Sequence, residues 1–248
     1  NSSITSVLRQ RDIFLHFPYQ SFHHIIDLLR EAAINPNVTS IHMTLYRVAQ
    51  NSSVVMSLIN AARNGKQVTV VMELQARFDE ENNIFWSNKL QEEGVKVSFG
   101  VNNLKVHSKL CLITHVHEGK QVRYAIIGTG NFNENTAKVY TDIFLLTARP
   151  EITKEVKKIF EFFDNRFEIG KYKHLMVAPL NMRAKMKQLI SREIRNAKDK
   201  KPAVLFFKLN NLVDKEIIKK LYEASNAGVK VKLIVRGICS LVPGVEGL

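Results

Sequence analysis

The chain contains two copies of one strand–loop–helix–strand pattern, and this repeat limits its possible folds more than any other feature. Residues 40–74, SIHMTLYRVAQNSSVVMSLINAARNGKQVTVVMEL, can be laid without gaps on residues 203–237, AVLFFKLNNLVDKEIIKKLYEASNAGVKVKLIVRG. The alignment places Gly65 on Gly228 at the end of the predicted helix, where a left-handed residue is favoured. A match of this length favours duplication over chance, so we expect two domains that share one topology.

Strand-like and helical patterns alternate throughout, which is typical of an α/β fold. The expected strands are 12–17, 40–46, 66–74, 95–99, 104–113, 122–128 and 140–147, and amphipathic helices are expected to begin near Tyr19, Ser52, Asp79 and Pro150. We expect the first domain to span 1–170 and the second 171–248. The chain starts without Met and stops soon after a strand, so we interpret it as a fragment whose second domain is truncated at its C-terminus.

Basic residues exceed acidic ones, and most of the excess lies in the second domain. Lysine and arginine number 36 against 23 aspartates and glutamates, a formal net charge of +13. Residues 1–170 hold 19 basic and 17 acidic residues, whereas residues 171–248 hold 17 and 6. This composition favours polyanionic partners such as nucleic acid, anionic lipid or polyphosphate, and it does not choose among them.

Cysteine usage and hydropathy indicate the compartment. Cys111 and Cys239 both lie in apolar strand-like runs, as expected of buried reduced thiols in an intracellular protein. No apolar run approaches the ~18 residues of a membrane helix. We therefore expect a cytoplasmic protein with neither a disulfide framework nor a zinc site.

The segment LKVHSKLCLI, residues 104–113, places His107 and Lys109 two positions apart in a predicted strand. Alternation would put both side chains on one face. An imidazole and an ammonium side by side favour a negatively charged third group. The alternative is a solvent-facing strand with no functional histidine.

A glycine-rich segment follows the next predicted strand. Residues 128–133 read GTGNFN, in which the glycines allow main-chain N–H groups to face an anion, while Asn131 and Asn133 add neutral donors. We therefore regard both asparagines as candidate phosphate ligands. An ordinary polar turn explains the segment equally well.

His-x-Lys followed by Gly-Thr-Gly-Asn resembles the HKD motif of the phospholipase D superfamily, whose members pair two duplicated domains and use a histidine nucleophile on phosphorus. The acidic residue of that motif is replaced by Thr114 here. This difference argues against hydrolysis of phosphodiesters. A phospholipase-D-like phosphodiesterase remains one alternative function, and a non-catalytic polyanion-binding module is another.

The chain more closely resembles the polyphosphate kinases, over essentially its whole length. The resemblance is carried by YRVAQNS, ELQARFDEENNI, LKVHSKLCLI, YAIIGTGNFNENTAKVYTD and LLTARPEI, in that order. It implies two phospholipase-D-like α/β domains and reversible transfer of the ATP γ-phosphate to inorganic polyphosphate through a phosphohistidine.

The same resemblance assigns site residues. It makes His107 the phosphorylated histidine, and Lys109 is expected to stabilise the phosphoryl group. It places Arg47 and Arg77 beside the phosphates and Mg²⁺, where we expect them to act through phosphate oxygens because arginine cannot ligate a cation. The resemblance also implies that Tyr140 and Arg236 contact the nucleotide.

Further expectations concern partners and completeness. A second catalytic histidine would lie beyond residue 248, so we expect residues 1–248 alone to be inactive. The resemblance implies Mg²⁺, ATP or ADP and polyphosphate as ligands, a homo-oligomer, possible peripheral attachment to a membrane, and no nucleic-acid partner. Basic residues of one predicted helix are candidates for a polyphosphate channel, with plain surface as the alternative; they are Lys185, Lys187, Arg192 and Arg195.

Overall fold

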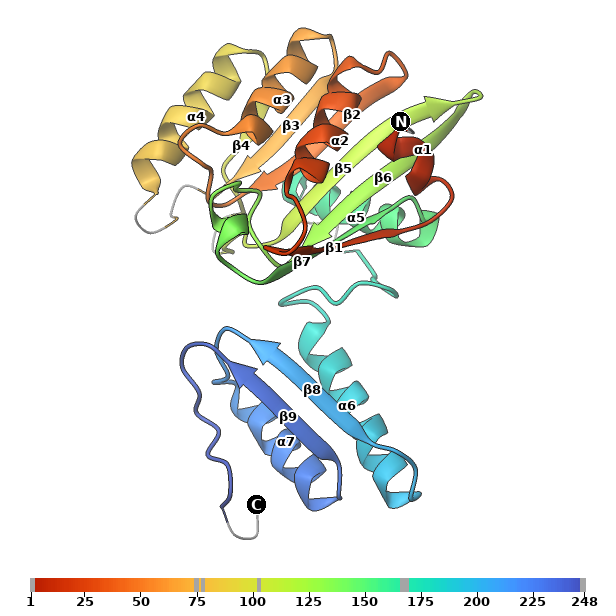
Figure 1. Ribbon diagram of the computed structural model, residues 1–248, viewed down its shortest axis with the longest axis vertical. Helices are drawn as coiled ribbons and strands as arrows, with labels where there is room; N and C mark the ends of the chain where they lie inside the picture. Colours follow the sequence, from red (N-terminus) through yellow and green to blue (C-terminus); the bar gives the residue numbers. More distant parts are fainter. Residues whose placement is uncertain (1–2, 74–75, 77–78, 102–103, 166–169, 246–248) are drawn as a thin grey trace. The chain divides into compact units, whose positions relative to one another are not determined.

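The structure is a computed structural model that describes residues 3–73, 76, 79–101, 104–165 and 170–245. The chain forms two compact units, residues 1–174 and 175–248 (Figure 1). Both units combine helices with a β-sheet, so the expected α/β class is confirmed.

The first unit is built on a mixed seven-stranded sheet in the order β1-β7-β6-β5-β2-β3-β4. Its strands are β1 (Ile13–Phe17), β2 (Val38–Leu45), β3 (Gln67–Met72), β4 (Lys96–Ser98), β5 (Lys109–His117), β6 (Lys120–Gly128) and β7 (Asp142–Thr147). β2, β3 and β4 run parallel, whereas β1, β7, β6, β5 and β2 pair antiparallel in succession.

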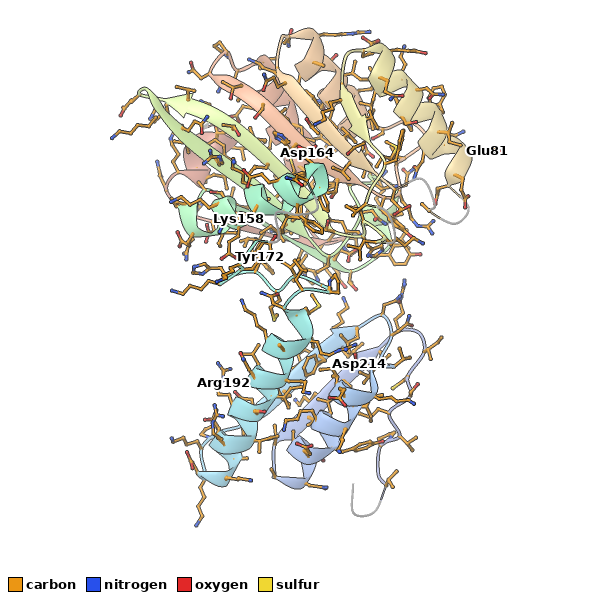
Figure 2. The ribbon with its side chains drawn as sticks, turned by 180° about the vertical axis from the view of Figure 1, so that it is seen from behind. Glu81, Lys158, Asp164, Tyr172, Arg192 and Asp214 are labelled. Carbon is orange, nitrogen blue, oxygen red and sulfur yellow. The ribbon has the colours of Figure 1, made fainter. Side chains whose placement is uncertain are left out.

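Helices cover both faces of this sheet. On one face lie α1 (Ile4–Leu8), α2 (His23–Ile34), α3 (Ser53–Arg63) and α4 (Glu80–Glu92), and on the other lies α5 (Pro150–Asp164), which Figure 2 shows from its own side. A short 3-10 helix, η1 (Thr136–Lys138), precedes β7. Local chemistry begins the long helices where expected: Ser52 Oγ accepts from the Val55 amide at 3.2 Å, and Pro150 occupies the first turn of α5. The core buries apolar side chains from both layers, so the sheet is held rigidly.

The second unit repeats part of this plan. It contains α6 (Met182–Lys198), β8 (Val204–Leu209), α7 (Lys215–Asn226) and β9 (Lys230–Val235), with β8 and β9 paired in parallel. The core between sheet and helices includes Ile190, Leu205, Leu221 and Ala224. No helix in the described part of the chain is long and apolar enough to cross a membrane.

The strand register shifts the ungapped sequence alignment by one residue in its first strand. Leu45 pairs with Met72 between β2 and β3, and Leu209 pairs with Val235 between β8 and β9. The ungapped alignment would match Leu45 with Lys208 instead. Because side chains alternate between faces, that slip would exchange the buried and exposed sides of the strand.

By the end of the helix the ungapped alignment holds. The helices begin after Ser52 and Asp214, which both cap through their side chains and are still one position out of step in that alignment. Gly65 and Gly228 lie in the turns that follow these helices, with positive φ angles of 77° and 89° that favour glycine. The strand–helix loop is shorter in the second copy, so the loop that carries Arg47 has no residue-for-residue counterpart there.

The run 104–113 is not one strand, contrary to expectation. β5 begins at Lys109, and His107 lies in the segment that precedes it. The side chain of Thr44 on β2 takes the place of a regular strand partner: its Oγ1 donates to the Ser108 carbonyl at 2.7 Å and accepts from the Leu110 amide at 2.9 Å. The alternation inferred from sequence therefore does not extend to His107.

Candidate functional site

The end of β2 and the start of β5 lie at one edge of the first sheet. The strands are antiparallel neighbours, with Met43 opposite Cys111, so the residues after β2 approach the residues before β5. Tyr46 and Arg47 directly follow β2, and Lys109 opens β5. The fold therefore gathers residues that are about 60 positions apart in sequence.

His107 and Lys109 contact each other at this edge. Lys109 Nζ donates to the His107 carbonyl at 2.6 Å and lies 3.0 Å from its Nδ1. His107 is exposed to solvent, whereas only 5% of Lys109 is exposed. The ammonium is thus fixed in the protein while the imidazole remains accessible to a substrate.

The surroundings of His107 favour the neutral ring. Partial burial lowers the pKa of His107, and the neighbouring cations Lys109, Lys105 and Arg47 lower it further. The carboxylate of Glu73 acts in the opposite direction. Since the ordinary pKa of histidine is about 6.5, the imidazole is neutral at pH 7 and one ring nitrogen keeps its lone pair.

Lys109 remains a cation at neutral pH, although burial weakens its hold on the proton. Burial lowers the pKa of Lys109 from 10.5 to about 8; Asp142 raises it and Arg47 lowers it. Asp142 begins β7 and was not anticipated from the sequence. A neutral imidazole can act as a nucleophile, and an ammonium beside it can stabilise negative charge on a group that it attacks.

Two further residues that sequence analysis missed hold the site together. Glu73, just after β3, accepts from the Val106 amide at 3.1 Å and so fixes the segment that carries His107. Asn83 is fully buried and donates from Nδ2 to the carbonyls of Tyr46 (2.8 Å) and Glu73 (3.0 Å). The repeat contained a signal for Glu73, because it aligns with Arg236 at the carboxyl end of the matching strand.

Arg47 lies at the same edge and pairs with Asp79. Its Nη1 contacts Asp79 Oδ2 in an ion pair, and both side chains remain partly exposed. Asp79 is the N-cap residue of α4, yet it makes no side-chain cap hydrogen bond. Its carboxylate is directed to the arginine instead. Arg77, the other predicted phosphate arginine, lies outside the described residues.

The glycine-rich segment packs closely against β7. A Cβ at Gly130 would lie 2.4 Å from Asp142 Oδ2, so only glycine fits. Thr129 Oγ1 donates to Asp142 Oδ1 at 2.8 Å. The absence of a side chain at residue 130 therefore allows Asp142 to occupy its position near Lys109.

The two candidate asparagines differ in their surroundings. Asn133 Oδ1 accepts from the amides of Asn135 (2.9 Å) and Thr136 (3.1 Å), so this oxygen caps a local turn. Asn131 Oδ1 is buried and has no hydrogen-bond partner among the described residues. Both observations concern the amide oxygen, whereas a phosphate would accept from Nδ2, so both asparagines stay predicted phosphate ligands.

The predicted nucleotide residues belong to different units. Tyr140 follows η1 with its side chain half exposed, and its amide donates to Thr136 at 3.0 Å. Arg236 follows β9 and donates from Nε to Asn210 Oδ1 at 2.9 Å. Their shared role at a nucleotide stays a prediction.

The described residues do not assemble a metal site of their own. Among them there is no group of three or more His, Cys, Asp or Glu side chains that could hold an ion. Arginine supplies no lone pair for a cation. The expectation that Arg47 and Arg77 lie beside Mg²⁺ through phosphate oxygens stays a prediction.

Two other predicted features have ordinary structural environments. Thr114 lies buried within β5, between Ser40 and Arg123 on the flanking strands. On α6, Lys187 pairs with Glu216 at 2.8 Å and Arg192 with Glu193 at 3.1 Å. The channel role of α6, including Lys185 and Arg195, stays a prediction.

Comparison with known families decides where this chain belongs. Residues 3–169 match the family described as polyphosphate kinase C-terminal domain 1, and residues 175–248 match polyphosphate kinase C-terminal domain 2. The chain belongs to the polyphosphate kinase family. The resemblance inferred from the five sequence motifs is thereby confirmed.

Individual relatives agree with the family assignment. Polyphosphate kinases of Vibrio vulnificus (strain YJ016) and Escherichia coli (strain K12) are 55% and 51% identical to it over 241 residues, which is 97% of this chain. The crystal structure of polyphosphate kinase from Porphyromonas gingivalis matches with a TM-score of 0.87 at 43% identity, again over 97% of this chain. The chain spans 34% and 35% of the two curated relatives and 40% of the solved chain.

Proposed function

We propose that the protein transfers the γ-phosphate of ATP reversibly to inorganic polyphosphate, with His107 as the phosphorylated residue. The observation that carries this proposal is the exposed, neutral imidazole of His107 beside the buried ammonium of Lys109. Family membership supplies the substrates, because the chain matches the polyphosphate kinases over nearly all its length.

The first step forms a phosphorus–nitrogen bond. The ring nitrogen of His107 that holds a lone pair attacks the γ-phosphorus, the bond to the β,γ-bridging oxygen breaks, and ADP leaves with that electron pair. No proton has to be removed before the attack, since the imidazole is neutral. A Mg²⁺ ion bound to the nucleotide would neutralise charge on the phosphate oxygens, beside Arg47 and Arg77.

The second step returns the phosphoryl group to oxygen. A terminal phosphate oxygen of polyphosphate forms a bond to phosphorus while the phosphorus–nitrogen bond breaks, which lengthens the polymer by one unit. Lys109 and Arg47 neutralise the charge that gathers on the equatorial oxygens in both steps. Further phosphate or nucleotide contacts are proposed for Arg77, Asn131, Asn133, Tyr140 and Arg236.

Incubation of the full-length protein with γ-labelled Mg–ATP tests the proposal. We expect acid-labile, alkali-stable label on the protein, mapped to residue 107 by mass spectrometry, and no label on a His107→Ala variant. The matched control is His24→Ala, because His24 is an exposed histidine on α2. Label that persists in His107→Ala would refute the assignment of the nucleophile.

The same assay separates the alternatives. A phospholipase-D-like phosphodiesterase would cleave a phosphodiester without ATP, and a polyanion-binding module would bind polyphosphate without ever carrying label.

Self-association, peripheral membrane attachment and the lack of a nucleic-acid partner are proposed from the family resemblance. Mass photometry, vesicle flotation and gel-shift assays on the full-length protein test them in turn.

A further inference from the structure

The aromatic ring of Tyr46 is the point at which the basic groups around His107 meet. The ring contacts the imidazole edge to face, with centroids 4.5 Å apart and planes at 78°. Lys109 Nζ lies 5.0 Å from the ring centroid, and Lys105 Nζ and Arg47 Cζ each lie 5.9 Å from it. These groups come from three places in the chain: the end of β2, the segment before β5, and the first residue of β5.

Cations gathered around one imidazole repel one another, so something must offset the repulsion when no phosphate is bound. The negative face of an aromatic ring attracts cations within about 6 Å of its centroid. Edge-to-face contact between rings is favoured by the same charge distribution. Tyr46 therefore adds its attraction to that of the carboxylates Asp79 and Asp142, and none of the chemical steps above uses it.

Tyr46 is itself held by rigid structure. It directly follows β2, where Leu45 is buried in the core. Its main-chain carbonyl accepts from Nδ2 of the fully buried Asn83 at 2.8 Å. Tyr46 lies in the bend that follows β2, and its main chain is held there by the strand before it and by Asn83, as a residue that positions others must be.

We propose that Tyr46 is a positioning residue that holds the His107 imidazole and the Lys105 and Lys109 ammoniums in the geometry that receives the phosphoryl group. In this arrangement Lys105 is an additional phosphate contact, which sequence analysis did not identify. The inference rests on the phosphohistidine chemistry proposed above, and it adds the residue that prepares the site before the nucleotide binds.

Three variants of the full-length protein test the proposal. Tyr46→Phe keeps the aromatic face, Tyr46→Leu removes it, and Tyr19→Leu is the matched control because Tyr19 is 74% exposed near β1. NMR titration of the His107 ring is the first readout. We expect Tyr46→Leu to raise the pKa of His107 toward its ordinary value, because water reaches the ring and the cations are released; Tyr46→Phe and Tyr19→Leu leave it unchanged.

The rate of phosphoenzyme formation at saturating Mg–ATP is the second readout. We expect Tyr46→Leu to lower this rate on the order of ten-fold or more, as misplacement of reacting groups does, and Tyr46→Phe to keep it. A wild-type rate and pKa in Tyr46→Leu would overturn the proposal. A Tyr46→Phe variant as slow as Tyr46→Leu would also overturn it, since the hydroxyl and not the ring would then be responsible.

Two further outcomes are possible: Tyr46→Leu does not fold, or His107 is not phosphorylated in the wild-type protein. If Tyr46→Leu does not fold, as judged by circular dichroism, Tyr46→Met replaces it and is held to the same outcomes. If the wild-type protein carries no phosphate on His107, the proposed function fails. The NMR titration still reports in that case whether Tyr46 positions the imidazole, so the two failures are distinguishable.

Discussion

Lys109 Nζ donates to the main-chain carbonyl of His107 at 2.6 Å and lies 3.0 Å from Nδ1 of the same residue. The contact joins a buried cation to an exposed imidazole. The ammonium lowers the pKa of His107, since two positive charges at this distance repel, whereas burial lowers the pKa of Lys109. Chemistry therefore requires a pH at which His107 has lost its proton and Lys109 still holds one.

The pH profile of kcat/KM should show this window. Because the pKa of Lys109 is lowered to about 8, we expect activity to fall above pH 8, by about tenfold per pH unit, as the ammonium deprotonates. The pKa of His107 is lowered, so the acid limb should lie below 6.5. Lys109→Arg should abolish the alkaline limb, because arginine keeps its charge. An alkaline limb unchanged in Lys109→Arg would contradict the assignment to Lys109.

The Arg47–Asp79 ion pair should compete with phosphate for the arginine. We expect Asp79→Asn to lower the KM for polyphosphate by a few fold, at a cost in unfolding free energy of about 1 kcal/mol or less. Glu93→Gln is the control, since it removes a carboxylate from the Arg63 pair elsewhere on the surface. A KM that rises in Asp79→Asn would show instead that the aspartate holds Arg47 in its working position.

Two neighbouring glycines should respond differently to the same change. A Cβ at Gly130 meets the Asp142 carboxylate, whereas a Cβ at Gly128 meets the Phe144 ring, each at 2.4 Å. Gly130→Ala should displace Asp142, remove its support for the Lys109 proton and move the alkaline limb to lower pH. Gly128→Ala should overpack the core and reduce the unfolding free energy by about 1–3 kcal/mol. Thermal unfolding and pH profiles of both variants measure the two effects, and an unmoved limb in Gly130→Ala would separate Asp142 from Lys109.

Removal of the Thr44 hydroxyl should disturb the segment that carries His107. Thr44→Val keeps the shape but leaves the Ser108 carbonyl and the Leu110 amide without their side-chain partner. We expect a loss of about 1–3 kcal/mol in unfolding free energy, together with slower phosphorylation of His107. Thr114→Val is the matched control on β5 and should change kcat/KM little, because Thr114 is buried at a distance from the site. Equal rate losses in both variants would refute a specific role for Thr44.

The elements of the first unit were largely predictable because they depend on local periodicity. Expected strand runs such as 40–46 and 122–128 correspond to β2 and β6, and the helix expected near Pro150 begins there. The predicted start of β5 at residue 104 was wrong, because the hydroxyl of Thr44 takes the place of a main-chain partner where the strand begins. Cys239 was expected to be buried in a strand-like run, but it lies beyond the end of β9 and is exposed.

The register of the repeat shows a similar limit. Sequence similarity alone aligned β2 with β8 one residue out of step, and hydrogen bonding across each parallel pair corrected it. An alignment scores residue likeness along the chain, whereas register depends on which face of the strand is buried.

The sequence by itself determined the alternation of elements, the duplication and the family, because periodicity and motif spacing are properties of the chain, and its resemblance to the family predicted His107, Lys109 and Arg47 as site residues. Only the tertiary structure brought Tyr46, Glu73 and Asp142 to the same place. They stand at the ends of three different strands, and their nearness follows from the order of strands in the sheet. That order also buries Lys109 next to an exposed imidazole, and burial, which no motif encodes, lowers the pKa values of both groups.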